Sequence, residues 1–205
     1  MAGLWKSFAP ETALAGMIES ELAALAGGAE FAVRAAGLPR RIGRALLPSG
    51  QMKLGVVLLE RGVWRACDLA ALACIEVVGA EVGMELFLHG DRDERLMSVR
   101  ALPLVSSQGE LQQFLRRLQS CNDQALFEAG FVDSNHAARV LDEADWNRAV
   151  LKLAFVGVAL ERITDWEART NPVLGAMLAD LAAERQAAGR PVWAGTNVVL
   201  ASLDR

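Results

Sequence analysis

Apolar side chains recur along this chain at the spacing of one face of a helix. The clearest case follows Ser107, where positions 111, 114, 115 and 118 are all apolar. Ser107 and Glu110 have the form of a capping box, in which the serine hydroxyl accepts from a helical N–H and the glutamate carboxylate bonds back to the cap. This pattern predicts a helix that begins at Ser107.

A second well-marked helix lies further along the chain. Asn171 is a typical N-cap, and Pro172 has a φ angle already locked near the helical value. An apolar stripe continues to Leu181, and Gly189 with Pro191 supplies a stop. We therefore predict a helix between Pro172 and Gly189.

Other segments predict helices from their caps and breakers. They are 10–26, the run that begins at Asp91 and ends at Pro103, and 146–159 with Asp145 as its cap. A further cap is predicted at Ser134. The apolar run 66–88 contains Gly79, and glycine inside a helix costs about 1 kcal/mol relative to alanine. We expect two short buried helices there with a break near Gly79.

Strand signals are sparse in comparison. Only 56–59 and 198–200 have a β-branched character, and no Asn-Gly or Asp-Gly hairpin pair occurs. We predict an all-α fold, and a chain of 205 residues is most simply one domain over 1–205. About nine to eleven antiparallel helices would stack in it, as a HEAT-like solenoid or an irregular helical bundle.

The composition is rich in apolar residues, at 53%. This predicts extensive helix burial or an apolar surface kept for a partner, with a homodimer as one alternative. Charges interrupt every apolar run and no secretory signal is recognisable, so we expect no membrane span and a cytoplasmic location. Three cysteines without C-x-x-C spacing are expected to be reduced and mostly buried: Cys67, Cys74 and Cys121.

Charge is unevenly distributed. The net charge of −4 argues against nucleic acid as a partner. Between positions 31 and 67, however, seven basic residues face Glu60 alone. Arg40, Arg41 and Arg44 could contact an anionic headgroup or phosphate and hold the protein at the inner face of a membrane. The alternative is a solvated loop whose charges are neutralised by Glu60 and by acids between positions 11 and 30.

Recognised catalytic motifs are missing from the sequence. It contains no G-x-S-x-G, P-loop, G-x-G-x-x-G or H-E-x-x-H pattern. The run 89–94 carries His89 and three acidic residues that could in principle bind a metal, but acidic residues at a helix start are favoured without any ligand. We predict a helix cap at Asp91, no metal site and no cofactor.

Polar residues concentrate on the helices of the second half of the chain. Each must either find a partner or face a cavity, because an unpaired buried polar group costs about 1–3 kcal/mol. Two interpretations stay open: a hydrogen-bond network that ties helix ends together, or a ligand pocket or partner surface. The candidates are Asn122, Glu128, Asn135, His136, Arg139, Asn147 and Lys152.

Several of these positions also carry a family resemblance. Cys121-Asn122, Asn135 to Arg139, Trp146 to Val158 and the tail from Glu184 to Pro191 follow in order. Over 91–191, and loosely before that, the chain resembles the EboA family. It departs from the family pattern at Trp146, where phenylalanine is usual, and at 132–134, where Asn-Pro-Tyr-Pro is usual.

The resemblance implies a predominantly helical protein of a secondary-metabolite pathway. Genes of this family lie beside those for a membrane-embedded prenyltransferase, a sugar-phosphate-cyclase-like enzyme and TIM-barrel metal enzymes, with a link to moving a precursor across the inner membrane. We therefore expect a non-catalytic accessory or scaffold protein that binds such a pathway enzyme or an intermediate. The alternative is an enzyme that acts on a small prenylated or phosphorylated metabolite near Glu128 and His136.

Overall fold

The computed structural model describes residues 3–203 and is predominantly helical. About 70% of it is helix, and the described residues contain thirteen α-helices and one two-stranded sheet. The predicted all-α fold is confirmed. The helices outnumber the nine to eleven expected because four of them have only four or five residues, too short to leave a periodic pattern. Contacts divide the chain into two compact units, Met1–Leu111 and Gln112–Arg205. A single domain over 1–205 stays a prediction.

Among its described residues, the first unit is built from six α-helices, two 3₁₀ turns and the sheet. In chain order these are η1 (Leu4–Phe8), α1 (Thr12–Ala26), α2 (Phe31–Ala35), α3 (Leu38–Arg41), β1 (Gln51–Leu54), β2 (Val57–Glu60), η2 (Arg61–Val63), α4 (Ala66–Val78), α5 (Ala80–His89) and α6 (Arg92–Val105). Helix α1 begins two residues later than predicted.

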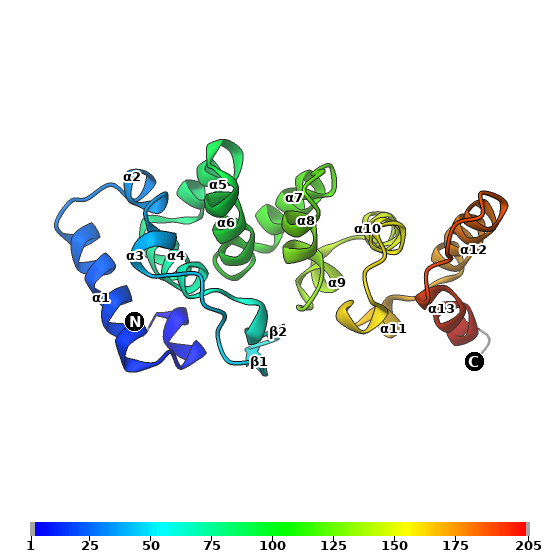
Figure 1. Cartoon of the computed structure of the whole chain (residues 1–205), viewed down its shortest axis with the longest axis horizontal. Helices are drawn as coiled ribbons and strands as arrows, with labels where there is room; N and C mark the ends of the chain where they lie inside the picture. The colour runs from blue at the N-terminus through cyan, green and yellow to red at the C-terminus, as the bar shows by residue number, and fades with distance from the viewer. Residues whose placement is uncertain (1–2, 204–205) are drawn as a thin grey trace. The chain divides into compact units, whose positions relative to one another are not determined.

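Helix α4 forms the centre of this unit. Every residue from Ala66 to Ile75 is buried, and α4 contacts α1, α5 and α6 (Figure 1). A helix that is apolar on all sides can only be stable when neighbours cover it all round. The burial also affects two thiols, because it raises the pKa of Cys67 to about 11 and that of Cys74 to about 12. Both cysteines are free and protonated at neutral pH.

The predicted break near Gly79 is confirmed. Gly79 has a φ of +103°, which glycine adopts readily and which separates α4 from α5. Gly83 then lets α5 approach its neighbours closely, since a Cβ there would lie 3.0 Å from a Leu102 methyl and 3.2 Å from an Ile75 methyl. The two glycines therefore set both the turn and the packing distance.

The sheet is a hairpin of β1 and β2, with Gln51 opposite Glu60 and Leu54 opposite Val57. The β-branched run 56–59 overlaps β2, so that strand signal was meaningful. The similar run 198–200 lies inside the helix Gly195–Leu203 instead, where Val199 is buried and Val198 is half exposed. Strand propensity over three residues is a weak signal that tertiary packing overrides.

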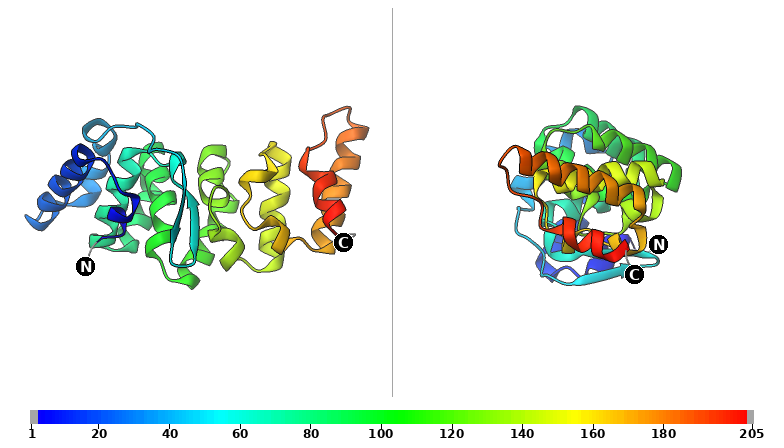
Figure 2. Two further views of the ribbon diagram at one scale, coloured as in Figure 1. Left: turned by 90° about the horizontal axis from the view of Figure 1, so that it is seen from below. Right: turned by 90° about the vertical axis from the view of Figure 1, so that its right-hand side faces the viewer.

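The second unit is entirely helical among its described residues, and α7 crosses the boundary into it. Its elements are α7 (Gln108–Gln119), α8 (Gln124–Phe131), α9 (His136–Val140), α10 (Glu143–Val156), η3 (Leu160–Arg162), α11 (Trp166–Arg169), α12 (Pro172–Ala187) and α13 (Gly195–Leu203). Helix α10 contacts α8 and α12, and α12 lies beside α13 (Figure 2).

Several predicted helix ends are confirmed. The Glu110 carboxylate accepts from the Ser107 main-chain N–H at 2.8 Å, and Asn171 Oδ1 accepts from the Leu174 N–H at 2.9 Å. Asp91 caps α6, where its carboxylate accepts from the Glu94 N–H at 2.9 Å. Asp91 and Glu94 thus form the cap of α6, whereas Asp93 is bonded to Arg44 and Arg65.

Three other predicted ends are wrong. Pro103 does not end α6, which continues to Val105. The proline removes one internal hydrogen bond, and the packing of α6 against α4 and α5 offsets that loss. Helix α10 is capped by Asp142 and not by Asp145, which lies in its first turn. The cap predicted at Ser134 is displaced by one residue, since α9 begins after Asn135.

Candidate functional site

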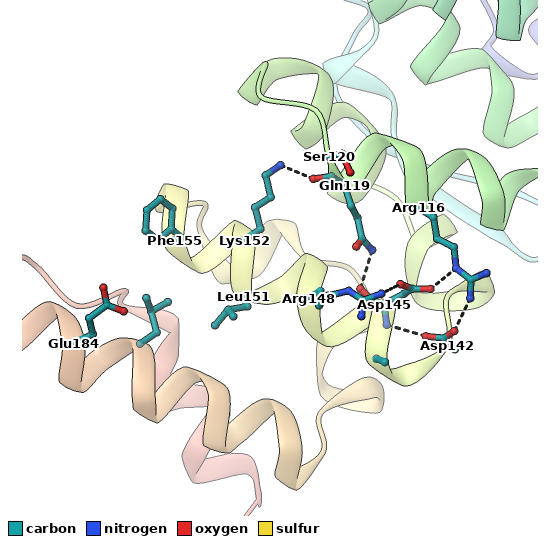
Figure 3. A pocket seen from close by; sticks show the side chains of 12 residues that line it. Arg116, Gln119, Ser120, Asp142, Asp145, Arg148, Leu151, Lys152, Phe155 and Glu184 are labelled. Atoms are coloured by element: carbon teal, nitrogen blue, oxygen red, sulfur yellow. Dashed lines mark hydrogen bonds and ion pairs between the residues drawn. The ribbon is translucent and has the colours of Figure 1, made fainter. Parts of the chain in front are cut away.

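A groove of about 1100 Å³ lies in the second unit between α7, α10 and α12 (Figure 3). Helix α10 contributes most of its lining, because positions 144, 145, 148, 151, 152 and 155 recur at helical spacing along one face. One part of the lining is charged and the other is apolar.

The charged part is centred on Asp145, which is only 2% exposed. Arg116 from α7 donates through Nε to Asp145 at 2.5 Å and through Nη2 to Asp142 at 2.7 Å. Arg148 donates to the other oxygen of Asp145. These contacts hold both arginines of the groove in ion pairs.

Asp142 is the N-cap of α10 and Asp145 lies in its first turn, where a helix favours negative charge. The Asp142 carboxylate accepts from the Asp145 main-chain N–H at 2.8 Å. That hydrogen bond, with the one from Arg116, holds the pKa of Asp142 below its usual value. Asp142 is therefore ionised and bonded at neutral pH.

Lys152 joins α10 to the end of α7. Its ammonium donates to the main-chain oxygens of Gln119 at 2.6 Å and Cys121 at 2.8 Å, and it lies 4.4 Å from the centre of the Phe127 ring. Carbonyls at the end of a helix have no internal partner and attract a cation. Lys152 thus caps α7 from a neighbouring helix (Figure 3).

Changing Lys152 to Met is expected to lower the free energy of unfolding by about 2 kcal/mol, since two charged hydrogen bonds to partly buried carbonyls are lost while the side-chain length is kept. Urea denaturation measures the change. Lys6→Met is a suitable control, because the Lys6 side chain is 54% exposed. Equal stability of the two variants would show that the capping contacts contribute nothing.

The apolar part of the groove is formed by Leu151, Phe155 and Leu181. Phe155 is 56% exposed, an unusual position for so large an apolar side chain. The Arg185 guanidinium lies 5.0 Å from the centre of its ring and donates to the Phe155 main-chain oxygen at 2.5 Å. Arg185 is therefore already bonded, and the ring remains open to a ligand.

Asn147, one of the predicted site residues, is engaged in a structural pair. Its amide donates to Asn171 Oδ1 at 3.1 Å, and the Asn171 amide donates back to Asn147 Oδ1 at 2.9 Å. Asn147 is 2% exposed. The exchange links α10 to the residue that caps α12.

Glu128 is also paired. One oxygen accepts from Arg162 Nη1 at 2.7 Å and the other from the Gln124 amide at 2.7 Å. Arg162 is bonded to Asp133 as well, at 2.6 Å. Asn122 and Arg139 are exposed on the surface of this unit.

His136 and Asn135 lie together at the start of α9, and both are buried. Burial, with the positive charge of Arg139, lowers the pKa of His136 to about 4, so the imidazole is neutral at physiological pH. Its Nδ1 is buried without a hydrogen-bond partner in the described structure. His136 does not line the groove.

Of the seven predicted polar residues, only Lys152 lines the groove. A ligand site formed by the whole set stays a prediction. Sequence reasoning missed Arg116, Arg148 and Phe155, although their spacing on α7 and α10 was visible. It also gave Arg185 no role, although the residue is part of the tail that carries the resemblance.

The three candidate arginines of the first unit differ in their contacts. Arg41 donates to Glu21 at 2.7 Å, and Arg44 donates to Asp93 at 2.5 Å. Burial of Glu21 opposes its ionisation, but the bonds from Arg41 and Arg34 outweigh burial and lower its pKa. Arg40 is exposed and has no ion pair among the described residues. Contact with an anionic surface stays a prediction.

A comparison with known protein families tests the resemblance to the EboA family. A family described as metabolite traffic protein EboA matches residues 80–197. The chain belongs to the EboA family. The match includes the whole groove lining, from Arg116 to Glu184. No curated protein and no solved structure matches the chain. Within residues 3–203, none of the helices is both long and apolar enough to cross a membrane.

Proposed function

We propose that this EboA-family chain is an accessory protein of a metabolite pathway, and that it binds a pathway intermediate in the groove without transforming it. The family description, metabolite traffic, supports a role in which a small molecule is held and passed on. The groove, at about 1100 Å³, is slightly larger than the ~300–1,000 Å³ that ligand sites usually measure, so it has room for a small metabolite.

The main support for this proposal is that the basic side chains that line the groove are already bonded to other groups of the protein. Arg116 and Arg148 are bonded to Asp145, and Lys152 is bonded to main-chain carbonyls. Groups paired in this way have little attraction left for a ligand, whereas Leu151, Phe155 and Leu181 gain free energy when a ligand removes them from water. The groove is therefore suited to bind the apolar part of a metabolite.

An enzyme site near Glu128 and His136 has less support. Glu128 is bonded to Arg162 and Gln124, and His136 is only 4% exposed. A general acid or base must come within hydrogen-bond reach of its substrate. Neither residue lines the groove in which a substrate would bind.

Partners and location form a further part of the proposal. By family membership, the intermediate would pass to or from pathway enzymes such as the membrane prenyltransferase or the sugar-phosphate-cyclase-like protein. A cytoplasmic position at the inner face of the membrane would suit that exchange. The exposed Arg40 is one group that could contact the headgroups.

Phe155→Ser tests the groove. N-phenylnaphthylamine, an uncharged apolar dye that fluoresces when bound, should bind the wild-type protein, and the variant should bind it about ten- to hundredfold more weakly. About half of the Phe155 side chain is exposed and can be buried by the ligand. Burial of apolar surface contributes ~25 cal/mol per Å² to the free energy of binding, and the expected loss of affinity follows from this value. Fluorescence titration gives both dissociation constants.

Val173→Ser is the matched control. Val173 is also 56% exposed in the same unit but does not line the groove, so its replacement should leave dye binding unchanged. No dye binding by the wild-type protein, or equal losses in the two variants, would contradict a ligand site in this groove.

A further inference from the structure

A second hollow adjoins the groove in the same unit. It measures about 760 Å³ and lies between the end of α10 and the segment that joins α12 to α13. Its lining is mainly apolar and includes Leu160, Trp193 and Val198. Trp193 is held in place by a bond from Nε1 to the Val158 main-chain oxygen at 2.6 Å. Val198, by contrast, is 51% exposed.

Phe155 lines both hollows. It therefore stands at their junction, with Leu151 and Leu181 on the groove side and Trp193 and Val198 on the other. Two neighbouring residues on α12 line different spaces. Glu184 lines the groove, and Arg185 lines the second hollow. The two spaces therefore share Phe155 as a common part of their linings.

The charges that line the two hollows indicate the chemistry of the ligand. The groove has three basic and three acidic side chains, and the second hollow has Arg185 and Glu161. The formal charges of the lining side chains therefore sum to zero in each of the two hollows. Among the basic groups, the arginines and Lys152 already have carboxylate or carbonyl partners. A charged ligand in the groove would have to compete with these bonds to gain a counter-ion, whereas an uncharged chain complements the apolar lining as it stands. In the second hollow, Arg185 Nε is buried without a hydrogen-bond partner among the described residues, so an anionic probe is included in the test below.

From this geometry we propose that the site takes an elongated, uncharged hydrocarbon chain, which lies along the groove, crosses Phe155 and ends in the hollow at Trp193 and Val198. The proposal rests on the proposed function and adds the class of ligand and its length. A chain that fills both hollows buries more methylenes than one confined to the groove, and each buried methylene is worth about 0.8 kcal/mol, or roughly fourfold in affinity.

Displacement of bound N-phenylnaphthylamine by octanol, dodecanol and tetradecanol tests the proposal. Tetradecanol should displace the dye from wild-type protein at a concentration at least tenfold lower than octanol. Val198→Glu places a carboxylate at the second hollow, where a hydrocarbon would have to desolvate it. We expect this variant to lose at least tenfold in affinity for tetradecanol and less than twofold for octanol.

Two further variants complete the design. Ala159→Glu, from another exposed position in the lining of the second hollow, should act like Val198→Glu. Val173→Glu introduces the same charge at a similarly exposed position outside both hollows. It should change the affinity for neither alcohol. Thermal unfolding of each variant verifies that it is folded.

The outcomes separate the two proposals. Suppose that the dye and octanol bind, but that neither glutamate variant at the second hollow selectively lowers the affinity for tetradecanol. The proposal of an elongated ligand is then wrong, while the ligand site in the groove stands. If wild-type protein binds none of the probes, the proposed function itself fails. Tighter binding of an anionic probe, such as dodecyl phosphate, than of dodecanol would also contradict the proposal that the ligand is uncharged.

Discussion

Replacing Asp68 with asparagine is expected to lower the free energy of unfolding by about 3–5 kcal/mol. Asp68 lies on α4 and is completely buried. It accepts from Arg65 Nη2 at 2.7 Å and from the Arg65 main-chain N–H at 2.8 Å, and Arg100 lies 3.4 Å away. These arginine side chains are only 12% and 14% exposed, so they would keep their charge without their main counter-ion.

Urea denaturation of wild type and variant measures this loss. Glu19→Gln is the control, because the Glu19–Lys6 pair spans 3.9 Å between side chains that are more than half exposed, and such pairs contribute about 0–1 kcal/mol. A loss of less than 1 kcal/mol for Asp68→Asn would show that water or Asp93, which also bonds Arg65, compensates for the missing charge.

A drop in pH from 6.5 to 4 should destabilise the wild-type protein by about 3 kcal/mol more than it destabilises His136→Gln. Burial lowers the pKa of His136 from 6.5 to about 4. Between these values the unfolded chain binds a proton that the folded protein does not, so stability falls as the pH falls. Above pH 6.5 both states are neutral at this position and the contribution is fully present.

The measurement is the free energy of unfolding in urea at several pH values, taken as the difference between wild type and variant so that the carboxylates cancel. His89→Gln serves as the control, since the His89 side chain is 74% exposed and the change should leave the pH dependence unaltered. Parallel pH profiles for wild type and His136→Gln would mean that the folded protein accommodates the charged imidazole.

Local chemistry explains which parts of the fold the sequence could predict. Asn171, Ser107 and Asp91 bond atoms within four positions of themselves, so their pattern is visible in the chain. Gly79 breaks a helix for a reason that lies in its own φ angle. Pro103 was misjudged because the packing of α6 against α4 and α5 offsets the hydrogen bond that proline removes. The weak strand signal at 198–200 did not alter the all-α prediction, and that run is helical.

The site was harder to predict for the same physical reason. The polar residues expected to form one cluster are divided among separate pairs, such as Glu128 with Arg162 and Asn147 with Asn171. The groove itself gathers residues from three helices. In the first unit, Arg41 of the basic segment is paired with Glu21, and Arg44 is paired with Asp93, which lies 49 positions away. Glu21 lies within the acidic stretch weighed from the sequence, but the pairing with Asp93 depends on the fold.

The bonds between α7 and α10 have a consequence for how this protein can vary. Lys152 donates to main-chain oxygens, and Gln119 donates through its amide to the Asp145 main-chain oxygen at 2.9 Å. Every residue has such an oxygen, so a substitution of the residue that accepts leaves the acceptor in place. Position 121 can therefore change without loss of the contact from Lys152, whereas the donor at 152 has no such freedom. Among the accepting positions, sequence drift is expected at 121, because the Gln119 side chain is itself a donor and the Asp145 carboxylate is bonded to Arg116 and Arg148.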